Sequence, residues 1–280
     1  MSALPTRSRN GLSNIVRHPV VAYFALTFTI SWMGALAVAA PHLIRHEPLP
    51  TMTGILMFPA MLLGPCISGV VLTRIVDGRS GLHDLFSRMF LARLPARWYT
   101  MLLLPPVLVL SVLLFLQTFV SPVYASNRFL TGILFGLPAG FLEEIGWMGY
   151  AFPKIRRPDN GLAPAIVLGL LWALWHLPVI NFLGTASPHG RYWFHFFLAF
   201  AVAMTAMRVL ISWMYINTKS VLLTQLMHLS STGSLVVFSP PRVTALQEVV
   251  WYLLYGTLLW LVVAIVVKRC GKRLMAEVRA

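Results

Sequence analysis

The chain has 280 residues, of which 58% are hydrophobic and only 11% are charged. Soluble domains carry about a quarter of charged residues, so this composition excludes a water-soluble globular protein. The net charge of +14 would suit a nucleic-acid-binding protein, but the basic residues lie in short tracts between long apolar runs. That arrangement is typical of a polytopic membrane protein, whose partner is the lipid bilayer, and we expect no nucleic-acid partner.

Eight apolar runs are long enough to cross a ~30 Å hydrocarbon layer, which needs about 20 helical residues. We therefore predict an all-α polytopic membrane protein, a bundle of about eight transmembrane helices forming a single transmembrane domain over 19–267. In chain order the runs are 20–40, 52–73, 99–120, 129–150, 162–182, 194–216, 220–238 and 247–267.

Lysine and arginine are distributed unequally between the two sides that these runs define. Seventeen of the 22 lie in the two tails and in the loops after the second, fourth and sixth runs, whereas four lie in the other loops. An excess of basic residues marks the cytoplasmic side. Both tails, 1–18 and the basic 268–280, are therefore predicted to be cytoplasmic, in the plasma (inner) membrane if the source is prokaryotic.

The basic loop 74–98 has a pattern of its own. Its apolar residues recur at helical spacing with arginines between them, which predicts an amphipathic helix lying on the inner leaflet. An ordinary cytoplasmic loop is the alternative. The apolar residues are Leu82, Leu85, Phe86, Met89, Phe90 and Leu94.

Few ionisable residues lie inside the apolar runs, where a charge costs at least ~2.5–3.5 kcal/mol. Of the eight acids, only Glu143 and Glu144 lie well inside a run, and Glu248 is among the six in loops, tails or run edges. Among the histidines only His176 and His228 lie deep. A lone intramembrane histidine is often a helix–helix hydrogen bond, but these four groups together predict a functional site.

These residue types suit hydrolysis within the membrane. Side chains of adjacent helical residues point about 100° apart, so Glu143 and Glu144 must face different partners. A glutamate facing a cavity can take a proton from water and make it a nucleophile. A histidine on another helix can donate to the oxyanion that forms when water adds to an amide.

At these residues the chain resembles the CAAX-processing and bacteriocin-processing (CPBP, Abi-type) intramembrane proteases, relatives of the Rce-type CAAX prenyl endopeptidase. That family carries three motifs in order: E-E-x-x-x-R, F-x-x-x-H and H-x-x-x-N. The corresponding segments here are 143–148, 172–176 and 228–232, which makes 143–232 the core of the resemblance.

The resemblance implies an intramembrane endopeptidase that cuts a membrane-associated or prenylated protein or peptide. Glu143 and His176 would activate the attacking water, Glu144 would support the site, and His228 would help to stabilise the oxyanion. No cofactor is assigned. If a divalent metal such as zinc is bound, the resemblance points to Glu143, His176 and His228 as its ligands, although the chain contains no H-E-x-x-H motif.

Two departures from the family pattern concern aromatic and hydroxyl groups. Trp172 replaces Phe and keeps an aromatic wall. Thr232 replaces Asn; its hydroxyl is shorter, and the adjacent Ser231 is an alternative donor. Two further tryptophans, Trp147 and Trp175, would suit either a lipid-accessible groove or the core of the bundle.

The third departure is Met148, which replaces Arg and removes the i,i+4 partner of Glu144. Arg208 is the only basic residue deep in a run, and an intramembrane arginine normally has an acidic partner. Pairing of Arg208 with Glu144 across two helices is therefore one hypothesis. The alternative is that Arg208 extends to the inner membrane surface.

Two other functions remain compatible with the same residues. A catalytically degenerate relative would serve as a membrane scaffold or immunity protein, and Met148 and Thr232 favour that interpretation. A proton-coupled transporter would use Glu143 and Glu144 as a relay, but the sequence shows none of the inverted-repeat symmetry common in transporters.

Overall fold

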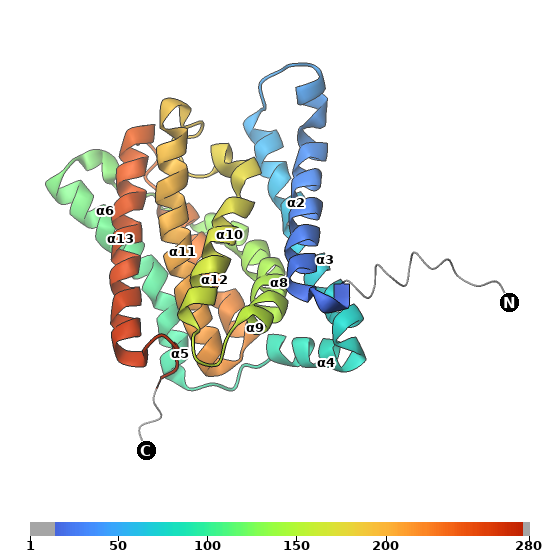
Figure 1. Ribbon diagram of the computed structural model, residues 1–280. Helices are drawn as coiled ribbons and strands as arrows, with labels where there is room; N and C mark the ends of the chain where they lie inside the picture. Colours follow the sequence, from blue (N-terminus) through green and yellow to red (C-terminus); the bar gives the residue numbers. More distant parts are fainter. Residues whose placement is uncertain (1–14, 277–280) are drawn as a thin grey trace.

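The computed structural model describes residues 15–276, and this part of the chain is built from helices (Figure 1). Six of them are long and apolar enough to cross a membrane. This confirms the prediction of an all-α polytopic membrane protein. The six are α2 (Pro19–Ile44), α3 (Thr51–Val76), α5 and α6 with the turn between them (Ala96–Phe119), α11 (Trp193–Thr218) with the turn before it, α12 (Val221–Phe238) and α13 (Ala245–Cys270).

The other two predicted spans differ from continuous helices. The run at 162–182 forms α10 (Leu162–Trp175), which stops at His176 and continues as a 3₁₀ segment, η6 (Leu177–Phe182). Pro178, at the second position of that segment, has no N–H for an α-helical hydrogen bond. The predicted span over 162–182 is therefore an α-helix followed by a 3₁₀ segment.

The run at 129–150 is interrupted twice by π-helical turns, which often mark functional sites. The first π turn ends at Glu143 and the second begins three residues after Glu144, so the backbone is irregular at the two buried glutamates. The pieces are α7 (Ile133–Pro138), η4 (Ala139–Glu143), α8 (Glu144–Gly146), η5 (Trp147–Ala151) and α9 (Phe152–Ile155).

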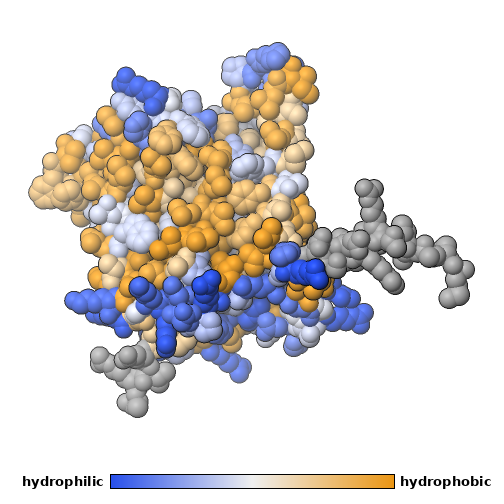
Figure 2. Space-filling view, in the orientation of Figure 1, coloured by the Kyte–Doolittle hydropathy of each residue, from blue (hydrophilic) through white to orange (hydrophobic). Residues whose placement is uncertain are grey.

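The chain passes back and forth between two ends of the bundle, and the described chain starts and stops at the same end, the lower one in Figure 1. Hydrogen bonds join distant segments there: Lys154 to Asp77 at 2.8 Å, and the Gly161 N–H to the Lys272 carbonyl at 2.9 Å. Hydrophilic side chains form a continuous band at this end in Figure 2. This end is rich in basic residues and is the one that the sequence predicts to be cytoplasmic, so we call it the inner end. The predicted tails lie partly outside the described residues.

The helix predicted within 74–98 is shorter than the pattern suggested. α4 (Gly78–Met89) is helical, whereas 90–95 is a loop before α5 (Ala96–Thr100). Leu85 is buried on the protein side of α4. Phe86 is 44% exposed and Phe90, just after the helix, is 77% exposed, which suits an amphipathic segment at a membrane surface.

Glycine allows the span that carries the glutamates to lie against α3. A Cβ added at Gly69 would lie 2.9 Å from the Gly146 Cα, and one added at Gly146 would collide with the Pro65 carbonyl. Only glycine fits where two backbones approach this closely. The contact sets the depth of α8 against α3.

Candidate active site

Glu144, the first residue of α8, is fully buried and fully paired. Arg208 on α11 donates from Nη1 to both carboxylate oxygens, at 2.7 and 2.8 Å, and His228 Nδ1 on α12 lies 2.7 Å from Oε1. All three side chains are at most 1% exposed. The structure thus brings Arg208 to Glu144 rather than to the membrane surface, and the two opposite charges compensate each other inside the bundle.

Glu143, one residue earlier, has different partners. Its Oε2 accepts hydrogen bonds from two indole N–H groups, Trp172 Nε1 at 2.7 Å and Trp147 Nε1 at 3.1 Å. Within residues 15–276 no hydrogen bond is made to its other oxygen, Oε1. The two adjacent glutamates therefore face different helices, and Glu143 keeps one oxygen available.

His176 lies at the point where α10 ends. Its Nδ1 is 2.7 Å from the Trp172 carbonyl, which can only accept a hydrogen bond. The hydrogen is therefore assigned to Nδ1, and Nε2 of the neutral ring carries a lone pair. The ring is enclosed by Trp175 at 4.8 Å and Phe200 at 5.1 Å between centroids. This imidazole can accept a proton or orient a water molecule.

Trp172 links all of these groups. Its N–H binds Glu143 and its carbonyl binds His176, while its ring lies 4.1 Å from the Arg208 guanidinium and 5.0 Å from the His228 ring. Sequence reasoning treated Trp172 as an aromatic wall only, but phenylalanine at this position would offer no N–H.

Trp147 has a similar role that the sequence could have indicated, because it lies four residues after Glu143 on the same helix face. Its groove or core assignment was left open, and the structure places it in the core with 0% exposure. The sequence feature that indicates this role is a tryptophan, with its indole N–H donor, four residues from a carboxylate that must be buried.

The remaining predicted residues lie one helical turn beyond His228. Ser231 is buried and Thr232 is half-buried on α12. In the part of the chain that the structure describes, neither hydroxyl is hydrogen-bonded to Glu143, Glu144, His176 or His228. Their oxyanion roles remain predictions.

The donor groups do not fit a metal site in this arrangement. Among the described residues, no three histidine, cysteine or acidic side chains form a group that could hold a metal ion. Glu144 is also held by a permanently cationic guanidinium, which would repel a divalent ion nearby. We assign no step to a metal.

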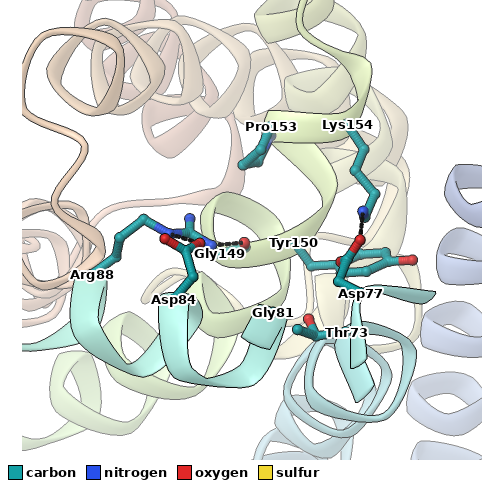
Figure 3. Close-up of a pocket in the computed structure, with 9 residues that line it drawn as sticks. All are labelled: Thr73, Asp77, Gly81, Asp84, Arg88, Gly149, Tyr150, Pro153 and Lys154. Carbon is teal, nitrogen blue, oxygen red and sulfur yellow. Dashed lines mark hydrogen bonds and ion pairs between the residues drawn. The ribbon is translucent and has the colours of Figure 1, made fainter. Parts of the chain in front are cut away.

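A cavity of about 260 Å³ opens at the inner end, between α4 and the segment that follows the two glutamates (Figure 3). Arg88 of α4 spans one wall, donating to Asp84 at 2.8 Å, to the Gly149 carbonyl at 3.1 Å and to the Tyr215 hydroxyl at 2.6 Å. The Lys154–Asp77 pair closes the other side. The lining residues are Thr73, Asp77, Gly81, Asp84, Arg88, Gly149, Tyr150, Pro153 and Lys154.

Positive charge is crowded near this cavity. Lys219 follows α11 at the inner end, and burial together with the charges of Arg156 and Arg88 lowers its pKa. The inner end therefore favours anionic groups such as lipid phosphates.

A second buried acid–histidine pair lies near the outer end, where the sequence indicated only peripheral residues. Glu248 accepts the backbone N–H groups of Thr185 and Ala186, both at 2.8 Å, and lies 3.1 Å from His189 Nε2. Glu248 and His189 are each 1% exposed. They were expected at a span edge and in a loop, but the loop folds over the first turn of α13 and excludes both from solvent.

Comparison with known proteins adds an independent line of evidence. The family model for "Type II CAAX prenyl endopeptidase Rce1-like" matches residues 125–234. This range includes Glu143, Glu144, His176, Arg208 and His228, which we call the inner cluster. The CAAX prenyl protease 2 of Methanococcus maripaludis is 27% identical over 222 residues, covering 74% of this chain and 80% of that protein. The chain is thus a multi-pass membrane protein that is similar in sequence to CAAX prenyl proteases, with the family match centred on the inner cluster.

Proposed function

We propose that this relative of the CAAX prenyl proteases is an intramembrane endopeptidase that hydrolyses a peptide bond of a prenylated or otherwise membrane-associated protein. Glu143 carries the proposal. Two indole N–H groups hold its Oε2, while no group of the described residues binds Oε1, which can therefore take a proton. The name of the Methanococcus relative supports the choice of a prenylated substrate.

In the proposed reaction Glu143 removes a proton from water, and the water oxygen bonds to the peptide carbonyl carbon. His176 orients that water through Nε2. When the C–N bond breaks, Glu143 returns the proton to the leaving amine, so one water is added across the amide. Trp172 and Trp147 hold the carboxylate in one orientation throughout.

The second glutamate has a positioning role. Glu144 holds His228 through Nδ1, and its charge balances an imidazolium that can donate from Nε2 to the oxyanion. Arg208 neutralises the resting carboxylate. The related proteases have an arginine at the position of Met148, four residues after the second glutamate. Met148 is buried and uncharged. We propose that the interhelical pair between Arg208 and Glu144 replaces the ion pair that such an arginine would make.

The proposed mechanism uses no metal, which can be tested directly. Purified protein in lipid nanodiscs should cleave a farnesylated peptide at the same rate before and after treatment with 1,10-phenanthroline. Loss of cleavage that zinc restores would overturn the metal-free mechanism.

The proposed function itself is tested in cells. Peptide termini in membrane fractions are compared between wild type and Glu143→Gln at matched protein levels, with Glu248→Gln as the control for a buried glutamate elsewhere. We expect termini that appear with wild type and Glu248→Gln but vanish with Glu143→Gln. Identical termini in all three would overturn the proposal and favour a degenerate scaffold or immunity protein.

A further inference from the structure

Five buried polar atoms gather on the α2–α3 side of Glu143, and none of them has a well-aligned hydrogen-bond partner among residues 15–276. Two of them, the Tyr23 and Thr27 hydroxyls, lie beside each other. The five side chains are at most 2% exposed. Hydroxyl groups that neighbour them on the same two helices are paired: Ser31 donates to the Met61 carbonyl and Thr73 to the Gly69 carbonyl, both at 2.6 Å. The five atoms are Tyr23 Oη, Thr27 Oγ1, Ser68 Oγ, Tyr150 Oη and Trp175 Nε1.

Contacts connect this group to both the cavity and the catalytic glutamate. Tyr150 lines the cavity (Figure 3), and its ring lies 5.4 Å from that of Tyr23. Tyr23 lies edge-on to Trp147 at 5.6 Å, and Trp147 donates to Glu143. Trp147 also contacts Trp175 at 6.0 Å, next to His176.

Two more of these hydroxyls lie along the same route. Thr27 is one turn above Tyr23 on the same face of α2. Ser68 precedes Gly69, where α3 touches Gly146, and a Cβ added at Gly146 would collide with the Tyr23 hydroxyl. Tyr150 lies seven residues from Glu143, about 10 Å along a helix, a distance that about three or four hydrogen-bonded waters span.

An unpaired buried hydroxyl costs about 1–3 kcal/mol, and native proteins usually satisfy such groups with protein or ordered water. Four hydroxyls and one indole N–H along one route therefore indicate a ligand that both donates and accepts hydrogen bonds. Water is small enough and has the required chemistry.

We infer that these five groups, called the hydroxyl track, bind a file of water molecules that supplies the attacking water from the inner cavity to Glu143. The inference rests on the proposed hydrolytic function, which consumes one water in each turnover. Lipid surrounds the outside of the bundle, so an enclosed glutamate needs such an internal supply.

Water occupancy can be measured without catalysis by hydroxyl-radical footprinting, in which X-rays generate radicals from waters bound beside the labelled side chain. In nanodiscs we expect Tyr23 and Trp147 to be labelled several-fold faster than Tyr124. Tyr124 is equally buried at 2% exposure, but its hydroxyl is paired with the Gln247 carbonyl. Equal labelling rates would overturn the inference.

Substitutions then test delivery. Ser68→Val and Tyr23→Phe should each slow Trp147 labelling and lower kcat on the farnesylated peptide about tenfold with an unchanged KM, whereas Tyr124→Phe should change neither. Slower labelling with unchanged kcat would refute the delivery role.

Failure of the track and failure of the function give different results. Glu143→Gln should retain fast Tyr23 labelling, because the track does not depend on catalysis. If wild type is labelled at Tyr23 but cleaves nothing, the proposed function fails and the water-binding part of the inference stands. If wild type cleaves but Tyr23 is labelled as slowly as Tyr124, the track fails.

Discussion

The inner and outer halves of the bundle each bury glutamate beside histidine, yet the two arrangements differ in what remains unpaired. Glu248, at the outer end, uses both carboxylate oxygens for backbone N–H groups and His189. Glu143, in the inner cluster, uses only Oε2 for hydrogen bonds within residues 15–276. Burial of an acid is common to both, so burial alone does not identify the catalytic group. The lone pairs left on Glu143 Oε1 distinguish the two acids among the described residues, and they are the reason we propose Glu143 as the catalytic group.

The largest expected difference between the two regions is in turnover. Glu143→Gln should lower kcat on a farnesylated peptide by about 10²–10⁴-fold, the contribution typical of a general base. Glu248→Gln should lower it less than about threefold. Mass spectrometry of the products, with both variants in nanodiscs, measures this; similar losses in the two variants would contradict the comparison.

Breaking the inner ion pair should affect stability next most strongly. Arg208→Met leaves Glu144 as an uncompensated buried charge, so we expect a loss of about 3–5 kcal/mol in the free energy of unfolding. Titration with SDS in mixed micelles measures it.

The double variant is the control for this pair. Adding Glu144→Gln to Arg208→Met should cost less than the sum of the two single changes, because the unpaired charge disappears. Strict additivity would argue against the pairing, as would a double variant that recovers nothing.

The indole N–H of Trp172 sharpens the comparison further, because the outer cluster has no equivalent donor to Glu248 among the described residues. Trp172→Phe should keep the packing but remove the hydrogen bond to Glu143. Since a bond to a charged group is worth about 1.5–3 kcal/mol, kcat/KM should fall about 10- to 100-fold. Trp251→Phe, at another fully buried tryptophan, is the matched control and should not reduce kcat/KM comparably.

The smallest effect is expected at the outer pair. Glu248→Gln weakens the hold on the loop that contains Thr185 and Ala186, so the free energy of unfolding should fall by about 1 kcal/mol. Amide hydrogen exchange at these two residues should become about fivefold faster. Unchanged exchange there would show that the backbone contacts do not order the loop.

Several features were predictable because they depend on one-dimensional properties. Six apolar runs became long helices at nearly the expected boundaries, since transfer of apolar residues into lipid depends on composition and length. The amphipathic pattern likewise located α4, although its helix is shorter than 74–98. The two runs 129–150 and 162–182 are irregular, which their composition did not indicate, because π turns and Pro178 break the α-helical hydrogen bonding.

The sequence by itself determined the membrane class, the inner and outer ends, and which few residues are expensive to bury, because each follows from transfer free energies and charge counts along the chain. Only the tertiary structure decided which hydrogen-bond and ion-pair partners these buried residues have. Arg208 and Glu144 are 64 positions apart, and whether the guanidinium reaches the carboxylate or the membrane surface depends on how α11 packs against α8. The same packing separates Glu143 from Glu144, because it directs tryptophan N–H groups to one glutamate and compensating charge to the other.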